Sequence, residues 1–336
     1  MKLRSKLAAG ALALTVLTAA VAVPTIPAVH AAVVADTTAS STSSSSETST
    51  LSKSYVVYGA GVSSSLYSDL NDVMDVDSSY TKLTATGSDY ATYINDGSST
   101  TDSAMVSSVA ITPAASGSGV KVNIKKYNGN NNITKVTAQQ YAMVAQMAGI
   151  TDITITVTAN RAVTGESALT GVYKAFAADG HQLNSQNTTA ANSVLEATQD
   201  AIDDNSSDSS YAGKLMAAVG NTSKEVAQKK QAGTSLTVVQ IEVILKQQLA
   251  KQGISSKTTA SQRTEIAQAL LKFENSPIAS SSTYVSNVSN TINNVKNSTG
   301  NLMSKAKSII NSDSGKQAVS WFQRLINWVK SLFTTN

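Results

Sequence analysis

The sequence predicts an α+β fold, with a small mixed or antiparallel sheet that is covered by helices and followed by a helical C-terminal region. Two observations lead to this fold class. Short runs in which apolar and polar residues alternate, as in half-buried strands, occur at 106–112, 120–124 and 153–159, and a shorter strand is expected at 55–58. From residue 211 onward the apolar residues have only helical spacing, and the last of these segments is an amphipathic helix.

The middle of the chain has the clearest signals, in the order β-β-α-β-α over residues 106–180. Pro113 and the two Ser-Gly pairs that follow it are turn material between the first two strands. Thr137 and Gln140 have capping-box spacing at the start of a helix, and Gly149 is expected to end that helix. In the next strand, isoleucine and valine alternate with threonine, which indicates one buried face.

A second central helix is expected over residues 164–176, with Thr164 as its N-cap. Gly171 lies inside this helix, where glycine costs about 1 kcal/mol relative to alanine. We therefore expect Gly171 to mark close packing of the helix backbone on the sheet. The free N–H groups at 165–167 would suit an anion. Glu166 already places a negative charge there, so structural packing is the favoured interpretation.

The flanking elements have weaker signals. Residues 63–65 are expected to cap a short helix, and the polar stretch 78–103 is interpreted as a loop or short helix. Residues 205–210 form a polar break and a candidate hinge. The further helices are expected at 187–204, 211–231, 235–252, 259–274, 283–312 and 316–333, of which 283–312 has only a narrow apolar seam among serine and asparagine.

The start of the chain has the pattern of a secretory signal peptide, residues 1–31. Three basic residues within positions 2–6 precede the apolar run 7–23, and cleavage is expected after Ala31, with a second choice after Ala35. The expected domain order is then a disordered Ser/Thr-rich spacer at 32–54, the α+β domain at 55–204, a helical region packed on or following it at 211–275, a polar and weakly helical connector at 276–314, and the amphipathic helix at 315–334.

Charge and cysteine content exclude several classes of protein. Three of the 26 lysines and arginines lie in the signal peptide, whereas all 22 acidic residues follow it, which leaves a mature chain with a formal net charge of +1. Such a chain is not expected to bind nucleic acid. The chain has no cysteine, which excludes disulfides and thiol catalysis. Absence of cysteine with abundant serine, threonine and asparagine fits an exported protein of a Gram-positive bacterium.

The residues for common hydrolytic chemistry are missing or scattered. The mature chain has one histidine, His181, in a polar loop, and no G-x-S-x-G motif, which argues against a Ser-His-Asp triad. Ser304 and Lys307 satisfy S-x-x-K, but the companion motifs of the penicillin-recognising enzymes are absent from the sequence, so this match is interpreted as coincidence. A glycosidase needs two carboxylates at a defined separation, and the sequence alone selects no pair.

Metal and cofactor binding are not expected. Zinc is improbable in a chain with no cysteine and a single mature histidine. Calcium is a minority interpretation, because the acidic clusters lack the D-x-D-x-D-G spacing of a calcium loop. These two clusters contain Asp69, Asp72, Asp75 and Asp77, and Asp200, Asp203, Asp204 and Asp208.

The C-terminal segment 315–334 is the sharpest signal outside the centre. Both tryptophans of the protein lie on its apolar side. This side is expected to dock on the protein's own domain or a second copy, or alternatively to contact a membrane surface, with docking the commoner case for such helices. The residues expected to make this contact are Trp321, Phe322, Leu325, Trp328, Val329 and Leu332.

Several central motifs together resemble one known family. They are Ser108-Val-Ala-Ile, Gly117-Ser-Gly-Val-Lys-Val, Ile133-Thr-Lys-Val-Thr, Gln140-Tyr141, Ala148-Gly-Ile150 and the run from Val163 to Ala175. This order resembles the YpuA-like family of secreted Firmicutes proteins, a domain of unknown function, over roughly residues 55–274. Asn160-Arg161 and Tyr58-Gly59 depart from the pattern in two loops. The resemblance implies export and a fold, and it implies no catalytic residue.

Two functions remain open from the sequence. The first is a non-enzymatic, secreted or surface-associated binding protein of the cell envelope, and the second is a carboxylate-dependent hydrolase acting on wall polymer or sugar. A flat polar surface would favour the binding protein, and a pocket with two close carboxylates would favour the hydrolase.

Overall fold

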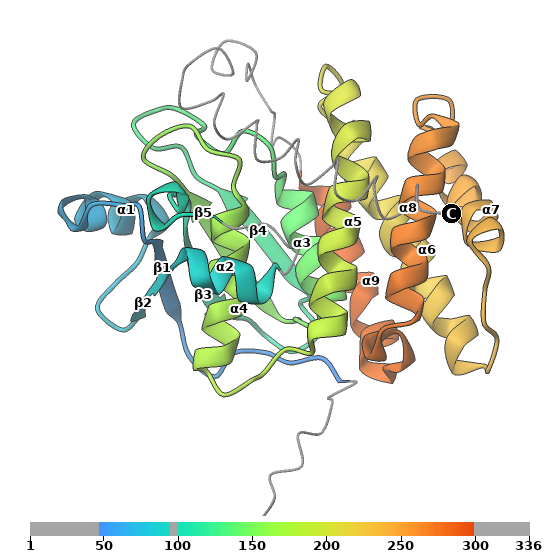
Figure 1. Cartoon of the computed structure of the whole chain (residues 1–336), viewed down its shortest axis with the longest axis horizontal. Coiled ribbons are helices and arrows are strands. Elements are labelled where there is room, and N and C mark those ends of the chain that lie inside the picture. Colours follow the sequence, from blue (N-terminus) through green and yellow to red (C-terminus); the bar gives the residue numbers. More distant parts are fainter. Residues whose placement is uncertain (1–46, 95–99, 299–336) are drawn as a thin grey trace, which may run out of the picture. The chain divides into compact units, whose positions relative to one another are not determined.

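The computed structural model describes residues 47–94 and 100–298, and within this part the strands form a single five-stranded sheet (Figure 1). Its order is β2-β1-β3-β5-β4. The strands are β1 (Tyr55–Gly59), β2 (Thr81–Ala85), β3 (Ser108–Pro113), β4 (Val120–Ile124) and β5 (Ile153–Thr158). The predicted α+β class is confirmed.

The sheet is mixed. Strand β3 is antiparallel to both of its neighbours, β1 and β5, whereas β2 pairs parallel to β1 and β4 pairs parallel to β5. Although β3 and β4 are consecutive, β5 lies between them. Parallel neighbours need a long crossover connection, and helix α3 (Ala138–Met147) supplies it between β4 and β5.

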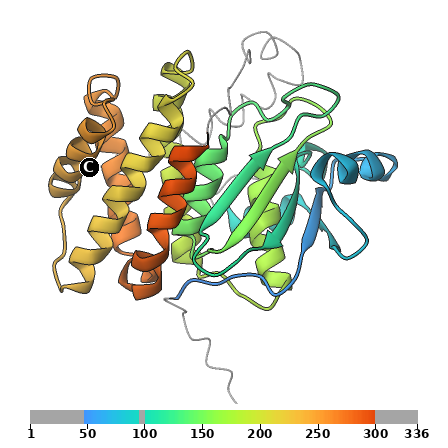
Figure 2. The ribbon, with the colours of Figure 1, turned by 180° about the vertical axis from the view of Figure 1, so that it is seen from behind.

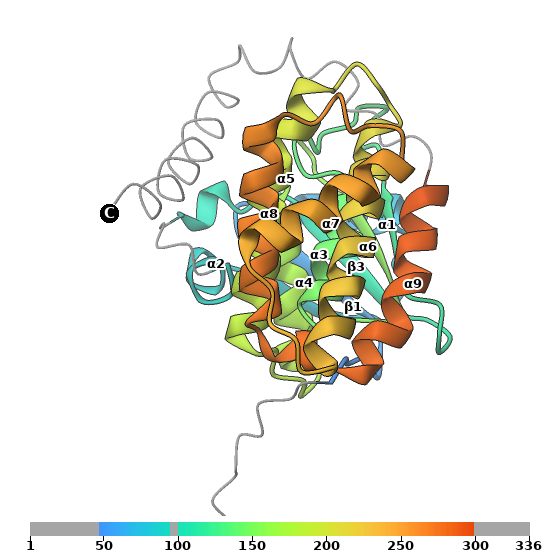
Figure 3. The same cartoon turned by 90° about the vertical axis from the view of Figure 1, so that its right-hand side faces the viewer.

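Nine α-helices surround and extend this sheet in the described part of the chain. Helices α3 and α4 pack on one face of the sheet, and α5, α6, α8 and α9 lie beyond α3, with α7 against α6 and α8 (Figures 1 and 3). Besides α3, the helices are α1 (Tyr67–Met74), α2 (Gly87–Tyr93), α4 (Glu166–Ala178), α5 (Ser185–Asp204), α6 (Tyr211–Gln231), α7 (Val238–Lys251), α8 (Ala260–Glu274) and α9 (Ser282–Asn297). None of these helices is long and apolar enough to cross a membrane.

The two faces of the sheet have different cores. Alternate residues of each strand, such as Tyr55 and Val57 of β1, belong to the large core shared with α3 and α4. The residues between them, Val56 and Tyr58, pack with Leu70 and the rest of a smaller cluster under α1. Because α1 is short, only part of the second face is covered.

The expected close packing at Gly171 is present. An added Cβ at this position would lie 2.8 Å from Cγ1 of Val109 and 3.2 Å from Cβ of Val57. The absence of a side chain therefore lets α4 approach β1 and β3. The predicted capping box of Thr137 and Gln140 is also confirmed at the start of α3.

Helix α4 begins one residue later than predicted. Its N-cap is Gly165, with a φ of 119°, instead of Thr164. This left-handed backbone favours glycine. A side chain at Gly165 would also meet the hydroxyl of Tyr141 at 2.5 Å.

The last residues of the expected disordered spacer belong to the fold. Ser49 pairs with the turn before β5, where its N–H donates to Gly149 O at 2.8 Å and its carbonyl accepts from Thr151 N at 3.0 Å. Leu51 is buried in the large core. The structured part therefore begins earlier than residue 55, because a few backbone hydrogen bonds and one leucine hold a segment whose composition alone predicts disorder.

Two further differences concern β2 and α9. Strand β2 lies in the stretch expected to be a loop or short helix, together with α2. Helix α9 lies within the expected weak connector, and it is packed: Val288 and Ile292 are buried. The side chain of Thr291 accepts from Val120 N at 2.9 Å, which caps the outer edge of β4. The predictions for the signal peptide, most of the spacer and the amphipathic segment 315–334 lie outside the described residues.

We expect Gly171→Ala to destabilise the protein by about 1–3 kcal/mol, because overpacking a tight contact displaces side chains or backbone. Urea unfolding of the mature protein measures this. The matched control is Gly213→Ala in α6, where the nearest atom to an added Cβ is Val295 O at 3.4 Å. That change is expected to be neutral or to stabilise by up to about 1 kcal/mol through helix propensity. Equal effects of the two substitutions would contradict the close packing of α4 on the sheet.

Candidate functional site

His181 lies beside a carboxylate but forms no catalytic triad. Its Nε2 is 3.6 Å from Oδ2 of Asp179. The hydroxyl of Ser52 donates to Asp179 at 2.7 Å, as do the N–H of Ser52 at 2.6 Å and the hydroxyl of Tyr55 at 2.9 Å. A triad would instead need the serine hydroxyl on the imidazole. The carboxylate therefore clamps residues 47–54, which precede β1 and are called the N-terminal segment below, to the end of α4.

The pKa values of the clamp follow from these contacts. Burial by itself would raise the pKa of Asp179, but the hydrogen bonds from Ser52 and Tyr55 outweigh burial and hold that pKa below its ordinary value. Burial, followed by the bond to Asp179, raises the pKa of Tyr55 to about 12. At neutral pH the carboxylate is therefore an anion and the phenol keeps its proton, as a structural hydrogen bond requires.

The aspartates of the first acidic cluster, in and after α1, contact different partners and do not converge on one point. Asp69 accepts from the hydroxyl of Tyr127, Asp75 pairs with Lys125 at 3.1 Å, and Asp77 accepts from Ser79 in a turn. Among the described residues, no three His, Cys, Asp or Glu side chains are grouped as a metal site would need. These aspartates therefore give no geometric support to the calcium interpretation.

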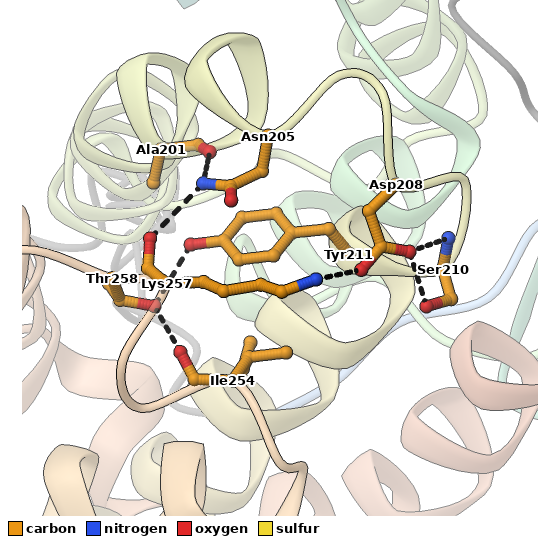
Figure 4. A network of polar contacts seen from close by, with 8 residues as sticks. All are labelled: Ala201, Asn205, Asp208, Ser210, Tyr211, Ile254, Lys257 and Thr258. Carbon is orange, nitrogen blue, oxygen red and sulfur yellow. Dashed lines mark hydrogen bonds and ion pairs between the residues drawn. The ribbon is translucent and has the colours of Figure 1, made fainter.

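One member of the second acidic cluster, Asp208, helps to latch the polar break between α5 and α6 to the loop between α7 and α8 (Figure 4). Asp208 pairs with Lys257 at 2.7 Å and accepts from the N–H and hydroxyl of Ser210. Asn205 donates to the carbonyl of Lys257 at 3.2 Å. The phenol of Tyr211 lies 2.9 Å from the hydroxyl of Thr258, and both are buried. The candidate hinge is thus held by side chains from another loop.

The N-terminus of α4 is packed against polar groups of the protein itself. The hydroxyl of Ser107 accepts from Ala168 N at 2.9 Å, and the buried carboxylate of Glu166 accepts from Thr164. Tyr141 donates to Gly165 O at 2.5 Å. Burial, followed by the charge of Glu166, raises the pKa of Tyr141 well above its ordinary value. This arrangement supports packing, and not anion binding, as the use of this helix end.

The part of the sheet that α1 leaves uncovered has a polar surface, which we term the open sheet face. In Figure 2 this face turns toward the viewer, and no helix of the described chain crosses in front of β3, β5 and β4. The three threonines of the face are half-buried, whereas its lysine and asparagine are exposed. The open sheet face consists of Thr112 of β3, Thr154 and Thr156 of β5, and Lys121 and Asn123 of β4.

The strand register aligns these five side chains. Thr154 pairs with Thr112 on one side and with Lys121 on the other, and Thr156 pairs with Asn123. Directly paired residues project to the same face of a sheet. Neighbouring strands lie about 4.8 Å apart, and residues two apart on one strand lie about 6.6 Å apart. The polar groups therefore form two short parallel rows at fixed spacing.

The side chains of the open sheet face have no hydrogen-bond or ion-pair partner among the described residues. Elsewhere on the same side of the sheet the polar groups are engaged: the hydroxyl of Thr158 donates to Lys125 O at 3.0 Å. Hydroxyl, amide and ammonium groups at regular spacing can donate to and accept from an extended ligand that carries many hydroxyls or some negative charge. Polar groups spread along neighbouring strands suit an extended chain better than a compact molecule, which needs a concave site.

Only part of this site is predictable from the sequence. The alternation in 153–159 indicates that one side of β5 is threonine. It does not show that Thr112 and Lys121 lie beside Thr154, because that depends on β4 pairing with β5 and not with β3. The residues expected to contact a membrane or partner, from Trp321 to Leu332, lie outside the described residues.

Comparisons with known proteins agree with the resemblance seen in the central motifs. Residues 58–292 match a family described as "Protein of unknown function (DUF1002)", and this match continues past residue 274 into α9. An uncharacterized protein YpuA from Bacillus subtilis (strain 168) is 31% identical over 151 residues, which are 44% of this chain and 50% of that protein. The chain thus matches about half the length of this curated relative. No solved structure matches the chain.

We expect Asp208→Asn to weaken the latch in a pH-dependent way. The hydrogen bond from Lys257, followed by those from Ser210, holds the pKa of Asp208 well below its ordinary value. A depressed pKa stabilises the fold above the unfolded-state value of about 3.9, and this stabilisation is lost as the pH falls through the folded-state pKa. The substitution should therefore lower the free energy of unfolding by about 1 kcal/mol or less near neutral pH.

The difference between Asp208→Asn and the wild type should shrink as the pH falls below about 4. Urea unfolding over this pH range measures it. Asp72→Asn, at an exposed position of α1, serves as the control. A difference between Asp208→Asn and wild type that stays constant down to the lowest pH would show that the charge of Asp208 does not stabilise the latch.

Proposed function

We propose that this chain, which belongs to the DUF1002 family of proteins of unknown function, is an exported, non-enzymatic binding protein of the cell envelope. Its binding surface is the open sheet face. The observation that carries the proposal is the set of five polar side chains, unpartnered within the described chain and held in register on three neighbouring strands. The signal pattern of residues 1–31 supports export and therefore contact with envelope polymers.

The rigidity of the strands supports binding at this face. The residues that alternate with Thr154 and Thr156 are Ile153, Ile155 and Val157, and all three are fully buried against α3 and α4. Packing on the far side therefore fixes the strand backbone, and with it the spacing of the threonines, before any ligand arrives. Pre-organised groups lose little conformational freedom on binding, which raises affinity for the same contacts.

The chemistry of the face favours a hydroxyl-rich polymer as the ligand. Three threonine hydroxyls and one asparagine amide supply both donors and acceptors, as sugar and polyol hydroxyls do. Lys121 adds one positive charge at the β4 edge and has no ion-pair partner among the described residues. Wall polysaccharide strands, with or without attached anionic polymer, have this chemistry and an extended shape.

The hydrolase alternative has less support from the same residues. The open sheet face contains no carboxylate. The aspartates that clustered in the sequence hold turns, ion pairs and the α5–α6 latch, as Asp77, Asp203 and Asp208 do. A pair of carboxylates free to protonate a glycosidic oxygen and to activate water is what that mechanism needs.

We expect the double substitution Thr154→Val, Thr156→Val to weaken binding to insoluble Gram-positive wall sacculi at least tenfold. Each lost hydrogen bond contributes about 1 kcal/mol, and a factor of ten corresponds to about 1.4 kcal/mol. Co-sedimentation of the purified mature protein at increasing sacculus concentration measures the affinity. Valine keeps the shape of threonine and favours strands, so the melting temperature should be retained.

The matched control is Thr84→Val, which makes the same change on the edge strand β2, outside the open sheet face. It should bind sacculi like the wild type. The wild type and Lys121→Gln are each tested on sacculi with and without attached anionic polymer. Weaker binding of Lys121→Gln only where the anionic polymer is present identifies a charged ligand, and equal binding of the two proteins to both preparations identifies a neutral one. Wild-type binding by the double valine variant, or no binding of the wild type to either preparation, would overturn the proposal.

A further inference from the structure

The outer side of α7 has two exposed valines among polar residues, and these valines have no packing partner in the described chain. Val239 and Val243 are the two large hydrophobic side chains that the described residues leave exposed, at 69% and 53% of their surface. They lie one helical turn apart. Lys246, with its aliphatic stem, and Ala250 are also exposed and continue the same stripe at spacings of four, three and four residues. We term these four residues the α7 stripe.

The fold does not itself need the α7 stripe. The opposite side of α7 supplies Ile241, Leu245 and Leu249, which are fully buried against α6 and α8. In Figure 3, α7 lies on the side of the helical layer that faces the viewer. The two valines therefore expose apolar surface to water, which is unfavourable, and they do not pack in the core. A helix that is apolar on two sides is expected to pack against a further element.

The C-terminal segment has a stripe with the same spacing. Trp321, Leu325, Trp328 and Leu332 follow each other at four, three and four residues, as the members of the α7 stripe do. Two helices with matching stripes of this kind can pack side by side with a crossing angle of about 20°. The large tryptophans would lie against the small residues of α7, and an aromatic face beside Lys246 would add a cation–π contact.

We propose that residues 319–333 dock as a helix on the α7 stripe of the same chain. The connection is long enough, because 22 residues separate Ser298 from Trp321 and can span about 70 Å when extended. A tether of this length holds the segment near α7 at an effective concentration that reaches the millimolar range. A weak patch suffices under these conditions.

The small size of the α7 stripe argues against a second copy as the occupant. A stable dimer usually buries about 800 Å² on each partner, whereas two valines, an alanine and a lysine stem present much less than that. An untethered partner would also have to overcome the loss of translational and rotational freedom. The tethered segment of the same chain avoids most of that loss.

Tryptophan fluorescence tests this directly, since both tryptophans of the protein lie in the C-terminal segment. In the full mature chain we expect blue-shifted emission and protection from acrylamide quenching, both independent of protein concentration. Val239→Asp together with Val243→Asp should shift the emission to the red and raise the quenching constant at least twofold. The control places aspartate at two exposed alanines of other helices, Ala91 and Ala178, and should leave both readings unchanged.

Four results would each overturn the proposal. The first is free quenching of the wild-type tryptophans, and the second is protection that the double aspartate variant does not change. The third is protection that grows with protein concentration, which identifies a second copy as the occupant. The fourth is protection that appears only with anionic phospholipid vesicles, which identifies a membrane surface. Circular dichroism of each variant shows whether the described helices are retained.

Discussion

The arrangement of the whole sheet domain depends on the contact of α4 with β1 and β3 at Gly171. With no side chain there, α4 lies close enough to bury the apolar side of the strands, and its two ends then fix other parts of the chain. At its start, Gly165 O accepts from Tyr141, which joins α4 to α3. At its end, Asp179 holds Ser52 and with it the N-terminal segment. Because α3 and α4 both occupy one face, the opposite face is left to the short helix α1, and the polar rows of β3, β5 and β4 stay accessible.

The helical part is joined to the sheet domain by buried neutral polar side chains as well as by the apolar core. The buried amide of Gln140 in α3 donates to Leu195 O and to the side chains of Thr198 and Gln199 in α5. Thr291 of α9 donates to Gln146 of α3 and accepts from the edge of β4. Buried polar groups destabilise a fold unless they are hydrogen-bonded. Such contacts tolerate little change in geometry, and they explain how a cysteine-free chain with few aromatic residues packs its helices in a defined way.

Features that depend on neighbouring residues in the sequence were predictable, and features that depend on distant ones were not. The capping box at Thr137, the glycine contact at Gly171 and the alternating strand β5 are local signals, and all three are present. Strand β2 has no comparable signal, because its position comes from pairing with β1. The packing of α9 depends on the contact of Thr291 with β4, a strand more than 150 residues earlier in the chain. The sequence of α9 gives only a weak helical signal, because it contains many poor helix formers. The open sheet face was visible only as threonines on β5, since the strand register decides what lies beside them.

The N-terminal segment gives the domain a defined point at which mechanical load enters. Glu47 and Thr48 contact Thr283 at the start of α9, Ser49 pairs with the turn before β5, and Ser52 is held by Asp179 at the end of α4. Tension applied to the chain ahead of Glu47 is therefore shared among three elements that are distant in sequence. The contact with α9 is loaded first, and the contact of Ser52 with Asp179 last. A domain connected in this way would yield in steps under a pull, with the sheet itself engaged only after the whole segment has been stripped away.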